Sequence, residues 1–175
     1  LSKLPSGVQI FSLFNAKHSI LYMLIDIFSA APSFANYLGS NVNMVDYLLE
    51  SNFYSPLEKK NDLESELYKI LKKNNYYEDK LDACRVWVKE KQFRAGVHLI
   101  LGISSIEDVS VSFSNIAEAC IICLFKVVSL EFSKRYGVLP KVNISIITMG
   151  KLATKEMTFS SDLDLIFVYQ PFKIK

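Results

Sequence analysis

The spacing of apolar residues changes once along this 175-residue chain, and that change constrains its fold most. Up to Tyr136, apolar side chains recur with the three-to-four-residue period of an amphipathic α-helix. After Val142 the period falls close to two, which is typical of a β-strand. We therefore predict an α+β fold that is mostly α. A helical region covers residues 1–137, and the start of a sheet domain covers 138–175.

Local signals divide the helical region. Pro32 predicts a new helix, because proline is favoured in a helix's first turn. Ser104 and Glu107 have the spacing of a capping box, which predicts a helix start there, and Gly137 predicts its end. The expected helices cover 8–38 with a restart at Pro32, 44–49, 62–71, 78–101 and 104–136. The expected strands cover 142–149, predicted to be buried, and 165–169.

Composition narrows the function classes. Lys and Arg number 20 against 18 Asp and Glu, so the formal charge of +2 favours no nucleic-acid binding. The longest apolar stretches, 20–38 and 116–130, are interrupted by charged residues or proline, so we expect no membrane span. A secretory signal pattern is not seen, and the 3 cysteines lie in helical pattern. These features predict a cytoplasmic protein.

Some residues of the helical region allow two interpretations. Arg85, Lys89 and Arg94 form either a solvated, ion-paired helix surface or a set of cations that faces a phosphate site. The segment Cys120-Ile-Ile-Cys123 has redox or zinc spacing, but its position in an apolar helix favours core packing. For His18 and His98, in mostly apolar surroundings, structural roles are favoured over catalytic ones.

Candidate chemistry is concentrated between Ile144 and Tyr169. Asp162 and Asp164 would project from one face of a strand, and two such carboxylates suit Mg²⁺, which binds one or two carboxylates plus substrate phosphates. Gly150 would let the backbone approach a phosphate, and Lys151 would supply a charge. We expect Ser160 and Ser161 to contact the triphosphate. The order of these residues predicts metal-assisted nucleotidyl transfer. The alternative is that the Asp-x-Asp has no function, since two solvated carboxylates are also common at the polar start of a strand.

The wider motif resembles a known signature. The runs Met149-Gly-Lys-Leu152, Glu156-Met-Thr158 and Ser160-Ser-Asp-Leu-Asp-Leu-Ile-Phe167 resemble the bifunctional glutamine synthetase adenylyltransferase and adenylyl-removing enzymes. Those enzymes are polymerase-beta-like nucleotidyltransferases. A weaker resemblance continues upstream, through 77–87, 93–97 and 116–119. The chain looks most like the start of the C-terminal, adenylylating unit.

The resemblance implies transfer of AMP from ATP to a tyrosine hydroxyl of glutamine synthetase, with Mg²⁺ as cofactor and the PII signal protein as a regulatory partner. By the same resemblance Asp162 and Asp164 are the catalytic metal-binding pair. Gly150 and Lys151 match the family's Gly-Lys dipeptide on the triphosphate side of the site. Ser161 matches the residue just before the Asp pair.

Two departures from the family pattern bear on activity. Ala153-Thr154 stands where the family usually has Gly-Gly, and the chain ends at Lys175. We expect the third carboxylate, the rest of the sheet and the adenine pocket to lie outside this chain, which would then be inactive alone. A degenerate, non-catalytic remnant that serves as a helical interaction module is the alternative. A helical protein unrelated to nucleotides, with a structural Asp pair, is a third possibility.

Overall fold

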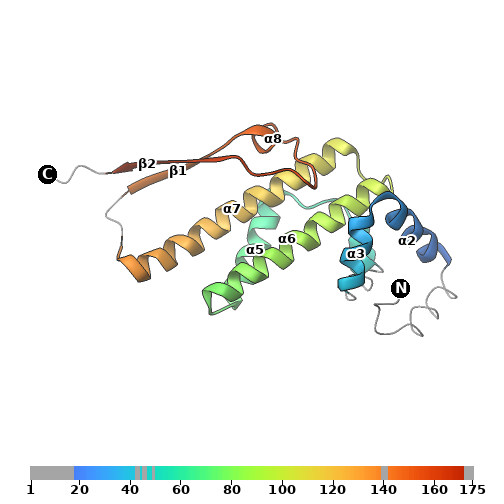
Figure 1. Ribbon diagram of the computed structural model, residues 1–175, viewed down its shortest axis with the longest axis horizontal. Coiled ribbons are helices and arrows are strands. Elements are labelled where there is room, and N and C mark those ends of the chain that lie inside the picture. Colours follow the sequence, from blue (N-terminus) through green and yellow to red (C-terminus); the bar gives the residue numbers. More distant parts are fainter. Residues whose placement is uncertain (1–17, 42–43, 45–46, 49, 139–141, 172–175) are drawn as a thin grey trace. The chain divides into compact units, whose positions relative to one another are not determined.

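A computed structural model describes residues 18–41, 44, 47–48, 50–138 and 142–171 (Figure 1). Helices dominate, and one antiparallel pair of strands follows them, which confirms the predicted fold class. Residues 8–17 of the predicted first helix lie outside the described part. The elements in chain order are α2 (His18–Ala30), α3 (Pro32–Ser40), η1 (Ser51–Tyr54), α5 (Lys60–Lys73), α6 (Tyr77–Ile100), α7 (Ile106–Tyr136), β1 (Val142–Thr148), α8 (Gly150–Ala153) and β2 (Leu165–Pro171).

Helix boundaries agree closely with the local signals. Pro32 stands in the first turn of α3, and Gly102 and Gly137 follow α6 and α7 with φ angles of +65° and +85°. Of the short helix predicted over 44–49, the described residues are helical. The predicted capping box is wrong by one residue. Ser105 caps α7, because its Oγ accepts a hydrogen bond from the Asp108 N–H at 3.1 Å.

The chain divides into two compact units. The first contains residues up to Pro56 together with Phe93–Val109, and the second contains Leu57–Gln92 together with Ser110–Lys175. This division follows packing, and α6 and α7 each contribute residues to both units. The boundary at 137/138, which rests on the change of apolar period, stays a prediction.

The first unit is built around a buried arginine. Arg94 is only 3% exposed, and it donates to the carbonyl oxygens of Phe53 at 2.8 Å and Ser55 at 2.6 Å. His98 is fully buried, and its Nε2 lies 2.6 Å from the same Phe53 oxygen. Since a carbonyl only accepts, Nε2 carries the proton, and Nδ1 accepts from the Ser104 hydroxyl at 3.1 Å. Arg94 therefore does not face a phosphate site, and His98 has the predicted structural role.

The second unit packs α5 against the first part of α6 and most of α7. Its buried apolar side chains are Leu63, Leu67, Leu71, Cys84, Trp87, Phe113, Ile116, Ala119, Cys123, Leu152 and Met157. The Cys84 and Cys120 sulfur atoms lie 3.4 Å apart, and the Cys123 sulfur lies 3.6 Å from the Glu64 carbonyl oxygen. Among the described residues, no group of three His, Cys, Asp or Glu could hold a metal ion. The cysteines therefore pack in the core, as predicted.

The surface of α6 near Arg85 is solvated. The Arg85 guanidinium lies 2.5 Å from Asp82, and their side chains are 73% and 70% exposed. Lys89 is also exposed. The ion-paired interpretation therefore holds for this surface.

Lys91 forms a partly buried ion-pair cluster in the second unit. Its Nζ lies 2.7 Å from Glu58 and 2.8 Å from Glu66, and its side chain is 10% exposed. Trp87 donates to Glu66 at 3.0 Å. Burial alone would lower the pKa of Lys91, but hydrogen bonds to Glu58 and Glu66 raise it above its ordinary value. Lys91 therefore keeps its charge at neutral pH.

We expect Lys91→Met to lower the free energy of unfolding of this unit by about 2 kcal/mol, because two neighbouring carboxylates lose their cation. Urea unfolding followed by the fluorescence of Trp87, the single tryptophan, measures this unit directly. Arg85→Met is the matched control, with an expected change within about 0.5 kcal/mol for an exposed pair. Equal stability of the two variants would contradict the prediction.

The sheet contains β1 and β2, paired from Val142 with Pro171 to Thr148 with Leu165. The prediction that β1 is buried is wrong. Ile147 is 48% exposed on the outer face of the sheet, which no further described strand covers, and Ile144 is 38% exposed on the opposite face, where it lines a hollow beside α7. Apolar side chains are also exposed along β2, at Ile166, Phe167, Val168 and Tyr169.

Helix α7 is long and apolar enough to cross a membrane by length and composition alone. Core helices of water-soluble proteins pass the same test. Here α7 buries Phe113, Ile116 and Ala119, and its Glu118 pairs with lysines of the same unit. The expectation that the chain has no membrane span stays a prediction.

Candidate nucleotidyl-transfer site

The candidate site lies where the two strands meet a loop. We call residues 150–164 the site loop. It leaves β1 through Met149, forms α8, turns back and enters β2 at Leu165. The Met149 N–H donates to the Asp164 carbonyl oxygen at 2.9 Å, which extends the β1–β2 ladder by one bond. Figure 1 shows α8 and the loop at one end of the paired strands.

Gly150 and Asp164 are in direct contact. The φ angle of Gly150 is +57°, in the left-handed region that favours glycine. A Cβ atom at this position would lie 2.8 Å from Asp164 Oδ2. The left-handed backbone angle therefore favours glycine at this position, and a side chain there would displace the exposed Asp164 carboxylate.

Asp162 and Asp164 precede β2 instead of lying within it. Regular pairing starts at Leu165, the predicted start of the second strand, so the pair lies just before the strand. Both residues are exposed, and the ion pairs of the described chain include neither of them. Carboxylate oxygens open to solvent suit Mg²⁺, which completes its shell with water or phosphate oxygens. The donor set thus fits part of a magnesium site.

The remaining predicted residues differ in their surroundings. Lys151 and Ser160 are exposed. Ser161 Oγ accepts from the Thr158 N–H at 2.9 Å and lies 2.8 Å from the Thr158 hydroxyl oxygen. This turn folds the chain back just before the Asp pair. The structure thus brings Gly150 to Asp164 and leaves Lys151 and Ser160 at the surface of the loop.

Ala153-Thr154, which replaces the usual Gly-Gly, fits the local backbone. Thr154 has φ −87° and ψ −2°, a right-handed conformation open to any residue. Its hydroxyl donates to the Glu156 carboxylate at 2.9 Å. The left-handed angle instead falls on Lys155, with φ +62°. The substitution therefore introduces no backbone strain at Thr154.

Sequence reasoning missed two residues, Lys155 and Glu118. Lys155 Nζ donates to Glu118 Oε1 at 2.5 Å and to Asn115 Oδ1 at 3.3 Å, which joins the site loop to α7. Glu118 was visible as a charge within an apolar helix. Its partner, 37 positions away, follows no local spacing rule.

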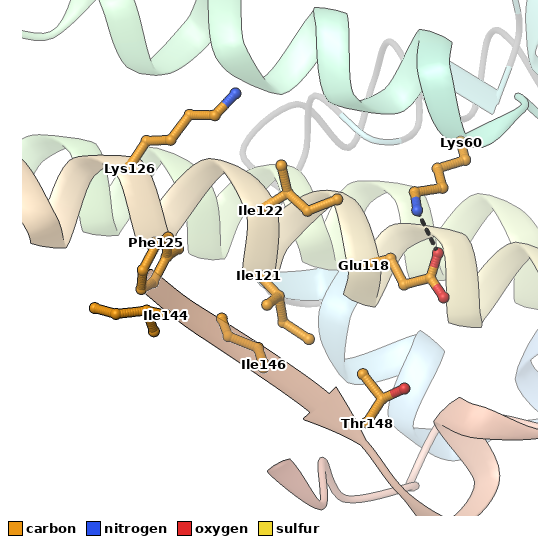
Figure 2. Close-up of a pocket in the computed structure, with 9 residues that line it drawn as sticks. All are labelled: Lys60, Glu118, Ile121, Ile122, Phe125, Lys126, Ile144, Ile146 and Thr148. Atoms are coloured by element: carbon orange, nitrogen blue, oxygen red, sulfur yellow. Dashed lines mark ion pairs between the residues drawn. The ribbon is translucent and has the colours of Figure 1, made fainter. Parts of the chain in front are cut away.

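A separate hollow lies between α7 and β1 (Figure 2). It has a volume of about 350 Å³ and is lined by Lys60, Glu118, Ile121, Ile122, Phe125, Lys126, Ile144, Ile146 and Thr148. None of the predicted site residues lines it. Figure 2 shows the Lys60–Glu118 ion pair close to the isoleucines. The mostly apolar lining does not suit a triphosphate, so the site loop remains the candidate for nucleotide chemistry.

Comparison with known proteins agrees with the motif. The family model described as "Glutamate-ammonia ligase adenylyltransferase" matches residues 21–174. Relatives described as bifunctional glutamine synthetase adenylyltransferase/adenylyl-removing enzyme are 32% identical over 169 residues in Brucella suis biovar 1 and 35% identical over 170 residues in Bartonella quintana. Both alignments cover 97% of this chain, which spans only 17% and 18% of the respective relatives. The chain belongs to the glutamate-ammonia ligase adenylyltransferase family.

Proposed function

We propose that this chain supplies the metal and triphosphate side of an adenylyltransferase centre. The complete centre transfers AMP from ATP to a tyrosine hydroxyl of glutamine synthetase. The observation that carries the proposal is the contact between Gly150 and the Asp164 carboxylate where β1 and β2 meet the site loop. Nucleotidyl transfer requires a position where the backbone can approach the phosphates, next to carboxylates that can hold the metal ion.

Each site residue has a proposed role. Asp162 and Asp164 would hold Mg²⁺, which when bound neutralises charge on the phosphates. The backbone at Gly150 would approach the triphosphate, and the exposed Lys151 would reach its oxygens. Ser161 Oγ accepts from the Thr158 N–H and shares a second hydrogen bond with the Thr158 hydroxyl. With the Thr158 hydroxyl as donor of that bond, the Ser161 O–H would donate to a phosphate oxygen. Ser160 is exposed on the same turn and would donate in the same way.

The proposal places the chain in the cytoplasm, with glutamine synthetase as the protein substrate and the PII signal protein as a regulator. The third carboxylate and the adenine pocket would come from polypeptide outside this chain. The chain alone would then bind Mg-ATP weakly and transfer no AMP.

Titration calorimetry with Mg-ATP tests the proposal. We expect measurable binding by the chain, alone or mixed with the remaining polypeptide of a relative. Asp162→Asn should weaken binding by about tenfold, because one of the two metal ligands loses its charge. Asp79→Asn, at another exposed aspartate in the first turn of α6, is the matched control and should bind as the unchanged chain does. Binding that is absent, or equal in both variants, would refute the proposal.

A further inference from the structure

Glu118 of α7 is bonded from two sides. Lys155 Nζ of the site loop lies 2.5 Å from Glu118 Oε1, and Lys60 Nζ of α5 lies 2.9 Å from Oε2. Partial burial alone would raise the pKa of Glu118, but hydrogen bonds from Lys155 and then Lys60 outweigh it and hold that pKa below its ordinary value. Glu118 is therefore a charged anchor on α7 at neutral pH.

The backbone of Lys155 is adapted to this contact. Among the described residues, Lys155 is the one non-glycine residue with a left-handed φ, at +62°. This region is unfavourable for a residue with a Cβ atom, and it persists where the surroundings determine the conformation. Here the Glu156 N–H donates to the Lys151 carbonyl oxygen at 2.9 Å and closes the turn that carries Lys155. A strained turn that directs its side chain to an ion pair indicates a positioning role.

Apolar contacts attach the loop on both sides of this ion pair. Leu152 and Met157 are 1% and 4% exposed, and the Phe159 ring centroid lies 6.4 Å from that of Phe113 on α7. The chemistry-bearing Gly150, Asp162 and Asp164 remain exposed at the two ends of the loop. The middle of the site loop is thus packed against the rest of the unit, while both of its ends are exposed to solvent.

We infer that Lys155 and Glu118 are positioning residues, which hold the site loop on α7 so that Gly150 and the Asp pair keep the arrangement that binds metal-bound triphosphate. This inference rests on the proposed function. The Lys155 and Glu118 side chains are 37% and 19% exposed, and a single partly exposed ion pair contributes little to global stability. Its loss should therefore loosen the loop while the rest of the unit stays folded.

Hydrogen exchange and calorimetry on the whole chain test this inference. In Lys155→Met we expect the Glu156, Thr158 and Ser161 amides to exchange about tenfold faster, because local opening becomes easier. Mg-ATP affinity should fall about fivefold, with the urea midpoint of Trp87 fluorescence nearly unchanged. Lys155→Arg, which keeps the charge, should restore both readouts. Lys60→Met removes the other cation from the same carboxylate without touching the loop, so it should change neither.

Different results would overturn the attachment of the site loop, its role in positioning the site, and the proposed function. Unchanged loop exchange in Lys155→Met, or an equal rise in Lys60→Met, would overturn the attachment of the loop by this pair. Faster exchange with unchanged Mg-ATP affinity would overturn its role in positioning the site. If the unchanged chain binds no Mg-ATP, the proposed function fails and the positioning role falls with it, while the exchange comparison still decides the attachment.

Discussion

The Gly150→Ala variant is expected to bind Mg-ATP about a hundredfold more weakly than the unchanged chain, a loss of about 2.7 kcal/mol. The added Cβ atom would lie 2.8 Å from Asp164 Oδ2, closer than non-bonded atoms approach. The backbone of Asp164 is tied to Met149 by a hydrogen bond of 2.9 Å, so the carboxylate has to swing away. The same methyl group would also stand where the phosphates approach. Titration calorimetry with Mg-ATP measures the effect.

Gly137→Ala is the matched control for this change. Gly137 has φ +85°, and an added Cβ atom there would meet nothing within 4 Å. Both alanine variants therefore carry the backbone cost of a left-handed residue, about 1 kcal/mol. Only Gly150→Ala adds the collision with a carboxylate. Equal Mg-ATP affinities in the two variants would show that the contact between Gly150 and Asp164 has no part in binding.

Helices and strands could be predicted because their signals are local. The apolar period, Pro32 and Gly137 lie within a few residues of the helix boundaries that they predict, and the structure has those boundaries. The start of α7 was misplaced because Ser104 and Ser105 are equally good caps by sequence. The structure uses Ser105, while the Ser104 hydroxyl bonds to His98. Because the Ser104 hydroxyl is used in a tertiary hydrogen bond to His98, Ser105 is the residue that caps α7.

The chemistry of the site remains a prediction from motif order, and its geometry could not be predicted from the sequence. The sequence order selects the Asp pair and Gly150 as candidates, but it does not predict that they lie in contact. The contact of Gly150 with Asp164 arises from the register of β1 with β2, which the apolar pattern does not specify. Likewise, the Lys155–Glu118 pair joins a loop to a helix 37 residues away. Such contacts depend on packing and leave no periodic trace in the sequence.

Arg94 shows the same limit within a helix. As a charged residue on α6 it was compatible with a solvated face or with phosphate binding, yet it is 3% exposed. Its apolar neighbours Phe93, Ala95 and Val97 are buried as well. An arginine within such a run has to satisfy its donors internally, and the available acceptors are the carbonyl groups around η1.

We expect Arg94→Met to lower the free energy of unfolding of the first unit by about 3 kcal/mol, because methionine donates no hydrogen bond to the buried carbonyl groups. Methionine fills similar space, so the change tests the hydrogen bonds and not a cavity. The carbonyl groups of Asn52 and Ser55 lose the bonds of 3.1 Å and 2.6 Å that Arg94 donates. The Phe53 carbonyl keeps its bond from His98. Arg94→Lys should recover only part of the loss, since an ammonium group cannot reproduce the planar fork of donors.

Hydrogen exchange of α3 amides reads the stability of this unit separately, because Trp87 lies in the other one. In Arg94→Met, exchange at Phe34 and Leu38 should accelerate about a hundredfold if these amides open with the unit as a whole. Arg135→Met is the control, because that side chain is 59% exposed and its pair with Glu131 should contribute little. Full stability of Arg94→Met would mean that water replaces the guanidinium at the carbonyl groups of η1, and that the first unit does not depend on this arginine.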